Sequence, residues 1–301
     1  MCATESTTRL WASELPLGLG TWRLGEDPRR RLAEIEALRD GLDLGYRLID
    51  TAEFYGQGEA ERMVGEAIRD VPDEVWVITK VWPSAADPAA VEARIRASLK
   101  RLGREWIDTV LLHWPSRAWS NPAVFERLAT LQRQGVVRSV GVSNYPLAWF
   151  VTARSQAAAA GLELSAHQVP YSLKDRRVES RLLPYHRQHG DWVLAWGALG
   201  QGRLPLRPAL LELARRLEVT PHQLALRWLV GRGGVTALVR STRRDHLRQN
   251  WQALRLPLSE PEAALLEQAY PPRGELKLAI PPWPTAFRLI EGGYRWWLRR
   301  R

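Results

Sequence analysis

Apolar and β-branched segments recur along the chain at a nearly constant interval. Six successive steps between segment starts measure 28–32 residues, and the seventh measures 43. The starts lie near Leu17, Arg47, Val75, Ile107, Val136, Leu164, Trp192 and Val235. A repeat of about 30 residues is typical of a strand followed by a helix. The pattern therefore predicts eight parallel strands that alternate with helices.

The segments between these strands carry helical signals. In residues 91–102, apolar side chains at 91, 95, 99 and 102 share one face. Capping residues precede prolines at 87–88 and 121–122, and capping boxes open residues 220–223 and 259–262. The longer last interval leaves room for an additional helix near residues 207–218.

Eight strand–helix units close naturally into a (β/α)8 TIM barrel. The competing architecture is an open, doubly wound sheet, which usually carries G-x-G-x-x-G after its first strand. The chain has no such sequence. We therefore expect a single barrel domain over residues 1–280, followed by a tail over residues 281–301.

Composition and charge restrict the function only slightly. The 301 residues carry a net charge of +10, with 39 Arg, 4 Lys and 15 Trp. Such a charge is compatible with nucleic acid or an anionic membrane, but composition favours an Arg-rich solvated surface as its explanation. The single cysteine, Cys2, excludes an internal disulfide and a Cys-based zinc site, and no metal is predicted. Without a secretory signal or a membrane-spanning run, a cytoplasmic protein is expected.

Polar side chains gather where three consecutive predicted strands end. Asp50 ends the second strand and Tyr55 follows it, Lys80 ends the third, and His113 follows the fourth. Each alone has an ordinary explanation, as a turn residue or an exposed side chain. Together they lie at the barrel rim that carries catalytic groups. Lys80 is also one of only four lysines in an Arg-rich chain, so its position favours a role that Arg fills poorly.

These four side chains can form a proton donor. A free tyrosine has a pKa near 10, and an adjacent ammonium favours the phenolate. We therefore expect Lys80 to lower the pKa of Tyr55, Asp50 to hold the ammonium, and His113 to hydrogen-bond the phenol or a substrate oxygen. Such a tuned general acid suits a carbonyl that is receiving a hydride.

Longer segments around these residues resemble the aldo-keto reductase family over about residues 10–272. The matching segments are 17–22 (LGLGTW), 45–56 (GYRLIDTAEFYG), 78–82 (ITKVW), 111–114 (LLHW), 141–144 (GVSN) and 247–250 (LRQN). Residues 25–27, 182–184 and 269–271 are most similar to small bacterial aldehyde or methylglyoxal reductases. The resemblance implies a TIM barrel with an N-terminal hairpin and extra helices, in which Tyr55 protonates the carbonyl oxygen, Lys80 and Asp50 tune Tyr55, and His113 orients the carbonyl.

The resemblance also implies NADPH, with NADH as a weaker alternative. Ser143, Asn144 and Gln168 match contacts to the nicotinamide amide, and Trp196 matches the stacking aromatic residue. The remaining positions that align with the family's cofactor contacts are Thr21, Trp22, Gly197, Leu199, Arg240, Ser241, His246 and Asn250. The pair Arg240–Ser241 matches a site for the 2′-phosphate, which the planar Arg fork suits chemically. Val239, His246 and Gly197-Ala198 depart from residues common in the family.

Four tryptophans match or extend the family's aromatic pocket walls: Trp22, Trp82, Trp114 and Trp119. They predict a tight apolar site for small or aromatic aldehydes and α-dicarbonyls such as methylglyoxal; Trp119 could instead pack beneath the loops. In the tail, Gly292-Gly293 is expected to break any helix. A tail that is disordered or folds on the rim is favoured over one that contacts a membrane.

Three functions follow from these observations. The first is an NADPH-dependent carbonyl reductase, a monomer with a small-molecule carbonyl substrate. The second is a barrel of the same fold that binds NADPH as a sensor or interaction module with little turnover. The third is nucleic-acid binding, for which the charge predicts only weak, salt-sensitive association without specificity.

Overall fold

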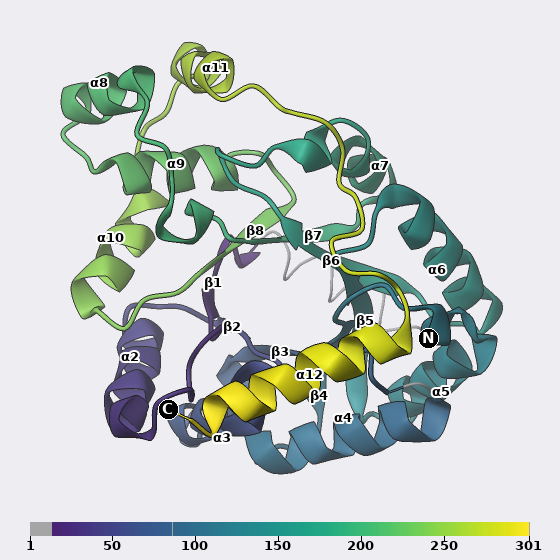
Figure 1. The fold of residues 1–301 in the computed structure, drawn as a ribbon. Helices are drawn as coiled ribbons and strands as arrows, with labels where there is room; N and C mark the ends of the chain where they lie inside the picture. The colour runs from purple at the N-terminus through teal and green to yellow at the C-terminus, as the bar shows by residue number, and fades with distance from the viewer. Residues whose placement is uncertain (1–13, 86, 301) are drawn as a thin grey trace.

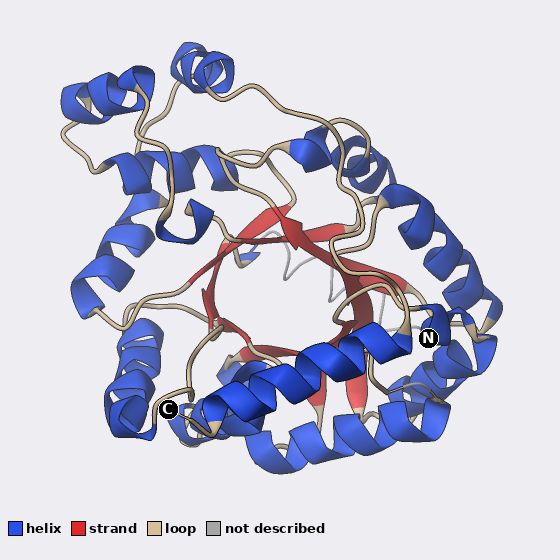
Figure 2. Ribbon diagram, in the orientation of Figure 1, coloured by secondary structure: helices blue, strands red, loops and turns tan. Residues whose placement is uncertain are grey.

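The computed structural model describes residues 14–85 and 87–300, which form a closed barrel of eight parallel strands surrounded by helices (Figure 1; Figure 2). The strands follow chain order around the barrel. They are β1 (Leu17–Gly20), β2 (Leu48–Asp50), β3 (Trp76–Val81), β4 (Ile107–Leu112), β5 (Val137–Ser143), β6 (Leu164–Pro170), β7 (Trp192–Trp196) and β8 (Val235–Val239). The predicted fold class is confirmed, and every strand begins within one residue of its predicted start.

The barrel closes where β1 pairs with β8, with Leu17 opposite Ala237 and Leu19 opposite Val239. The strands are buried along almost their whole length, because side chains fill the barrel on one face and helices cover the other. This double burial explains why the strands read as continuous apolar runs in the sequence.

The helices occupy the predicted intervals between strands. Those outside the barrel are α2 (Arg31–Asp43), α3 (Glu59–Ala67), α4 (Pro88–Leu102), α5 (Pro122–Arg133), α6 (Leu147–Ala159), α7 (Leu182–His189), α8 (Pro208–Arg216), α9 (Pro221–Val230), α10 (Arg244–Ala253) and α11 (Glu260–Ala269). The additional helix predicted near 207–218 is α8. The predicted caps also form: Asp87 and Asn121 accept backbone N–H groups, and Thr220 and Ser259 make capping boxes.

Short 3-10 turns complete the loops. They are η1 (Pro28–Arg30), η2 (Tyr55–Gly58), η3 (Pro72–Glu74), η4 (Arg117–Ser120), η5 (Arg177–Glu179) and η6 (Gly200–Gly202). The expected N-terminal hairpin falls mainly on residues 1–13, which lie outside the described residues. Within the described ranges, no helix is both long and apolar enough to cross a membrane.

The tail forms a helix, α12 (Pro284–Leu298), which crosses the barrel in front of β3 and β4 (Figure 1). The expectation that Gly292-Gly293 would break a helix is wrong. Neither glycine has a positive φ, and both lie inside α12. Glycine weakens a helix by only about 1 kcal/mol, and packing of Phe287, which is fully buried, holds this one on the barrel. Of the two alternatives favoured for the tail, disordered or folded on the rim, the structure shows the second.

Candidate active site

The barrel brings Asp50, Tyr55, Lys80 and His113 together at the carboxyl ends of β2, β3 and β4. Asp50 is the last residue of β2, Tyr55 opens η2, Lys80 lies near the end of β3, and His113 directly follows β4. All four are buried, with exposed fractions of 7% or less. Parallel strands place their carboxyl ends at one rim, so the sequence positions alone made this meeting predictable.

Lys80 is the centre of the cluster. Its Nζ lies 2.7 Å from Oδ1 and 2.8 Å from Oδ2 of Asp50. It also donates to the Thr51 carbonyl at 2.8 Å and to the Tyr55 hydroxyl at 3.2 Å. These acceptors satisfy an ammonium that has no solvent exposure. Burial lowers the pKa of Lys80, and the Asp50 carboxylate opposes that shift.

Asp50 is itself held from a second side. Gln168 donates Nε2–H to Asp50 Oδ1 at 2.7 Å, and Thr21 donates its hydroxyl to the Asp50 carbonyl at 3.0 Å. Both partners are buried residues that the sequence assigned to the cofactor site. Gln168 therefore also fixes the carboxylate that positions Lys80, and Thr21 fixes the Asp50 backbone.

The expectation that Lys80 lowers the pKa of Tyr55 is wrong for this structure. Burial raises the pKa of Tyr55 well above its usual value, and the negative charge of Asp50 and the nearby Tyr294 add to the rise. The desolvation penalty on a phenolate exceeds the attraction of an ammonium that Asp50 already neutralises. Tyr55 is therefore a protonated phenol at neutral pH. Because Lys80 donates to its oxygen, the phenolic proton is free to point toward another acceptor.

His113 is a neutral, incompletely bonded side chain beside this phenol. Burial and the nearby Lys80 charge hold the pKa of His113 well below its usual range. Among the described residues its Nδ1 has no hydrogen-bond partner, although it is buried. Its ring packs edge-on against Tyr55, with 5.7 Å between centroids. A buried unpaired nitrogen marks a place where a ligand can supply the missing partner.

Asn144 connects this cluster to the predicted nicotinamide side. It adopts a left-handed conformation with φ 66°, and its Nδ2 donates to the His113 carbonyl at 3.0 Å and to Ser143 Oγ at 2.9 Å. Trp196 donates its indole N–H to Asn144 Oδ1 at 2.8 Å. The half-buried indole is thus fixed by its edge, which suits stacking against a flat ring. Hydrogen bonds among these side chains cannot be read from sequence spacing.

A cluster of positive charge lies at the end of β8. Burial lowers the pKa of Arg240, and the neighbouring Arg30 and Arg23 charges lower it further, against Glu34 and Glu26. The charges of Arg23 and Arg30 beside Arg240 suit a phosphate group, although Glu34 and Glu26 offset part of them. The sequence missed Arg23 and Arg30 because they lie in the β1–α2 loop, where no motif distinguishes them from other surface arginines.

The other predicted cofactor residues lie in the loops after β7 and β8 and on α10. Ser241 exchanges local hydrogen bonds with the backbone of Arg243, and His246 is exposed on α10, which also carries the buried Asn250. Gly197 has φ 67°, and both it and Leu199 are partly exposed in the β7–η6 loop. Their roles as contacts remain predictions.

The four tryptophans predicted as pocket walls differ in exposure. Trp22 is 40% exposed and packs edge-on against Tyr55, whereas Trp82 is 3% exposed and packs edge-on against His113. Trp114 is half-buried and lies parallel to the His113 ring. Trp119 is 2% exposed and donates to the Ala85 carbonyl at 2.9 Å, an arrangement that fits packing beneath the loop.

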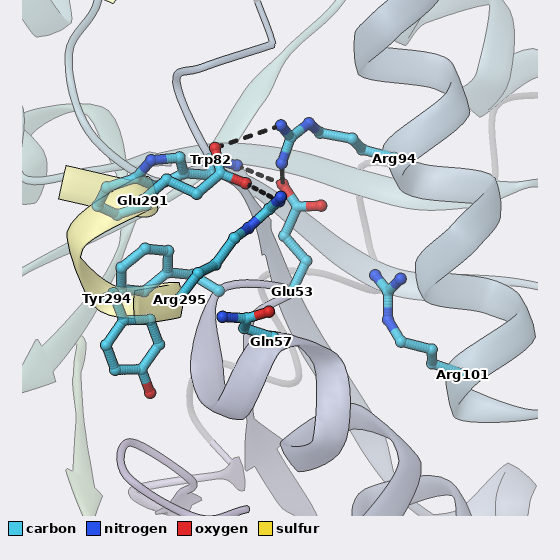
Figure 3. A pocket seen from close by; sticks show the side chains of 9 residues that line it. Glu53, Gln57, Trp82, Arg94, Arg101, Glu291, Tyr294 and Arg295 are labelled. Carbon is cyan, nitrogen blue, oxygen red and sulfur yellow. Dashed lines mark hydrogen bonds and ion pairs between the residues drawn. The ribbon is translucent and has the colours of Figure 1, made fainter. Parts of the chain in front are cut away.

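A small pocket of about 150 Å³ lies among η2, α4 and α12 (Figure 3). Its charged residues are already paired: Arg94 binds Glu53 at 2.9 Å, Arg295 binds Glu291 at 2.6 Å, and Arg101 binds Glu61 at 2.5 Å. The Trp82 backbone also donates to Glu53 at 2.7 Å. These pairs occupy the charged groups of the pocket, so the groups are not free to bind a ligand.

A parallel eight-stranded barrel with a buried Lys–Asp pair, a protonated tyrosine and a neutral histidine at its carboxyl rim defines a barrel enzyme equipped for proton transfer. Comparison with known proteins is consistent with this class. The chain belongs to the aldo/keto reductase family, whose model matches residues 16–271.

Individual relatives extend over most of the chain. It is 37% identical over 274 residues to methylglyoxal reductase YeaE of Escherichia coli (strain K12), covering 87% of this chain and 93% of the relative. It is 30% identical to methylglyoxal reductase DkgB of Salmonella typhi, covering 80% and 87%. A crystal structure of an aldo/keto reductase from Klebsiella pneumoniae in complex with NADP and acetate superposes with a TM-score of 0.82 at 36% identity, covering 87% of this chain and 94% of that one.

Proposed function

We propose that this chain is an NADPH-dependent reductase of aldehydes and ketones, with Tyr55 as the proton donor. The observation that carries the proposal is the buried contact of Lys80 Nζ with the Tyr55 hydroxyl at 3.2 Å, beside the unpaired Nδ1 of His113. This arrangement offers a phenolic proton and an imidazole to one oxygen atom. Membership in the aldo/keto reductase family supports a carbonyl as the group that carries that oxygen.

The residues on the adjoining rim fit NADPH. Trp196 offers an anchored indole to the nicotinamide ring, and the Arg240 cluster offers positive charge to the 2′-phosphate. The NADP complex of the Klebsiella relative supports this cofactor. When bound, the reduced nicotinamide supplies a hydride to the carbonyl carbon. Asn144, Ser143 and Gln168 would hold its amide.

The protein's own part in the reaction is to position and protonate. His113, held neutral by burial, orients the carbonyl oxygen by a hydrogen bond. Tyr55 gives its proton to that oxygen as negative charge develops, and Lys80, already donating to the Tyr55 oxygen, stabilises the phenolate that remains. Because the pKa of Tyr55 is raised, the phenol stays protonated until negative charge develops on the carbonyl oxygen.

The aromatic surroundings suit small or aromatic aldehydes and α-dicarbonyls. Trp22, Trp82 and Trp114 place apolar surface next to Tyr55 and His113. Two relatives are methylglyoxal reductases, which supports methylglyoxal as one member of this substrate class.

A substrate panel with NADPH and NADH in parallel tests the proposal. We expect NADPH oxidation with methylglyoxal and with 4-nitrobenzaldehyde, and a lower kcat/KM with NADH. Arg240→Ala should raise the KM for NADPH roughly tenfold and change that for NADH little, because it removes a charged phosphate contact. Arg215→Ala, at an exposed position on α8, is the control for lost positive charge. Tight NADPH binding without turnover across the panel would instead favour a sensor or interaction module.

A further inference from the structure

The C-terminal helix α12 reaches the candidate active site although it lies beyond residue 271, where the family match ends. Its inward residues are Phe287, Glu291 and Tyr294, spaced by four and three positions so that they share one face. Phe287 is fully buried and packs edge-on against Trp82, with 5.6 Å between centroids. Trp82 in turn donates its indole N–H to the Phe287 carbonyl at 3.2 Å.

Tyr294 contacts both chain neighbours of Tyr55. Its hydroxyl accepts the backbone N–H of Gly56 at 3.2 Å and donates to Glu26 at 3.0 Å, so it joins η2 to the β1–η1 loop. Its ring lies parallel to Phe54, with centroids 4.7 Å apart. Figure 3 shows Tyr294 projecting from α12 on the side of the pocket nearest Gln57.

The ring contacts of Tyr294 and Phe54 continue to His113. Phe54 stacks on Trp82 at 4.0 Å, and Trp82 packs edge-on against His113 at 5.2 Å. Tyr294, Phe54 and Trp82 therefore form a continuous aromatic column that ends at His113. We call these three rings the aromatic column.

The backbone that Tyr294 holds is unusually constrained. Gly56 has φ 54° and Gln57 has φ 55°, so two successive residues after Tyr55 adopt left-handed conformations. Left-handed backbone is unfavourable for Gln, and such turns persist only where the surroundings fix them. The bond from Gly56 to Tyr294 is one of those restraints.

From these contacts we propose that Tyr294 is a positioning residue, which keeps the Tyr55 hydroxyl in its reactive place through Gly56 and Phe54. The proposal rests on the function proposed above. Glu291 reinforces the same docking, since it accepts from Ser84 and lies 3.6 Å from Arg94. The C-terminal helix is then a working part of the site, contributed by a segment outside the family's matched region.

The test is Tyr294→Phe, which removes the hydroxyl and keeps the ring of the aromatic column. We expect kcat to fall roughly 5- to 20-fold, because a small displacement of a proton donor costs rate directly. The Kd for NADPH and the KM for the carbonyl should stay within about twofold. Amide hydrogen exchange in the peptide that contains Gly56 should accelerate, which reports the lost contact without relying on activity.

Two further variants separate positioning from general destabilisation. Tyr46→Phe removes another buried hydroxyl, which donates to the Leu247 carbonyl at 3.0 Å, and should leave kcat and exchange at Gly56 unchanged. Tyr294→Ala also removes a ring of the aromatic column and should lower kcat further than Tyr294→Phe.

The outcomes distinguish this proposal from the proposed function. If the wild-type chain reduces no carbonyl, the proposed function fails, while exchange at Gly56 still tests the Tyr294 contact. If the wild type is active and Tyr294→Phe changes neither kcat nor exchange, the positioning role is overturned. A rise in KM alone, or an equal loss of kcat in Tyr46→Phe, would overturn it as well.

Discussion

At Lys80 the fold buries an ammonium completely and surrounds it with acceptors from β2 and η2. An arginine would be too large for this position, and its broader charge would not reach the same three acceptors. The scarcity of lysine in an Arg-rich chain was therefore an informative signal. The direction of the Tyr55 pKa shift was not predictable, because it depends on how completely the phenol is removed from water.

The stability of the Lys80–Asp50 pair can be tested with a single variant and a double variant that removes both charges. Lys80→Met leaves the buried Asp50 carboxylate without its partner and should lower the free energy of unfolding by about 3–5 kcal/mol. The double variant Lys80→Met/Asp50→Asn removes both charges and should recover much of that loss. Both variants should have little reductase activity. Urea unfolding measures the stability, and equal stability of the single and double variants would contradict this description of the pair.

At the scale of elements, the strands and caps were predictable, and the helical conformation of the tail was not. Strand starts followed from the apolar repeat because strands buried on both faces leave a continuous signal. Capping residues located α4, α5, α9 and α11 through local hydrogen bonds. The course of α12 depends instead on long-range packing against Trp82 and Phe54, which outweighs the weak helix propensity of Gly292-Gly293.

The two glycines of α12 give a prediction at this scale. A Cβ added at Gly292 or Gly293 meets no atom within 4 Å, and neither φ is positive. Replacing each with Ala should therefore stabilise the protein by about 0.5–1 kcal/mol. Gly103→Ala is the matched control, since its Cβ is equally free but its φ is 64°, so it should destabilise. The Tm values from thermal unfolding compare the variants with wild type. A lower Tm for Gly292→Ala would contradict a continuous α12.

On the scale of the whole molecule, the net charge of +10 is the excess of 43 Lys and Arg residues over 33 Asp and Glu residues. Many arginines pair with carboxylates on and between helices, as Arg31 does with Glu66 and Arg216 with Glu262. Exposed pairs of this kind add little stability. Around Arg240 the neighbouring Arg23 and Arg30 add positive charge, partly offset by Glu34 and Glu26, where the cofactor phosphate is proposed to bind.

Buried histidines should make the stability of the whole molecule depend on pH. Burial holds the pKa of His167 well below its usual range, as it does for His113, so the folded state keeps both neutral. The unfolded chain protonates near pH 6.5, so stability should decline as pH falls below that value, by about 1.4 kcal/mol per pH unit for each histidine. Denaturant unfolding between pH 7.5 and about pH 5 measures the slope.

Variants assign the slope to individual residues. His167→Gln should reduce the pH slope of stability by about 1.4 kcal/mol per pH unit, the contribution of one histidine. His222→Gln should leave the slope unchanged, because His222 is exposed. An unchanged slope in His167→Gln would mean that His167 binds its proton equally in the folded and unfolded states, which would contradict the lowered pKa.

The role of Tyr55 is tested most directly by the rate of NADPH oxidation with methylglyoxal by wild type and Tyr55→Phe, with the Kd for NADPH measured on both. Tyr55→Phe keeps the ring between Trp22 and His113 and removes only the proton donor. We expect a roughly 10²- to 10⁴-fold lower kcat in Tyr55→Phe with an unchanged Kd for NADPH. Full activity in Tyr55→Phe would contradict the central claim that this phenol protonates the carbonyl oxygen.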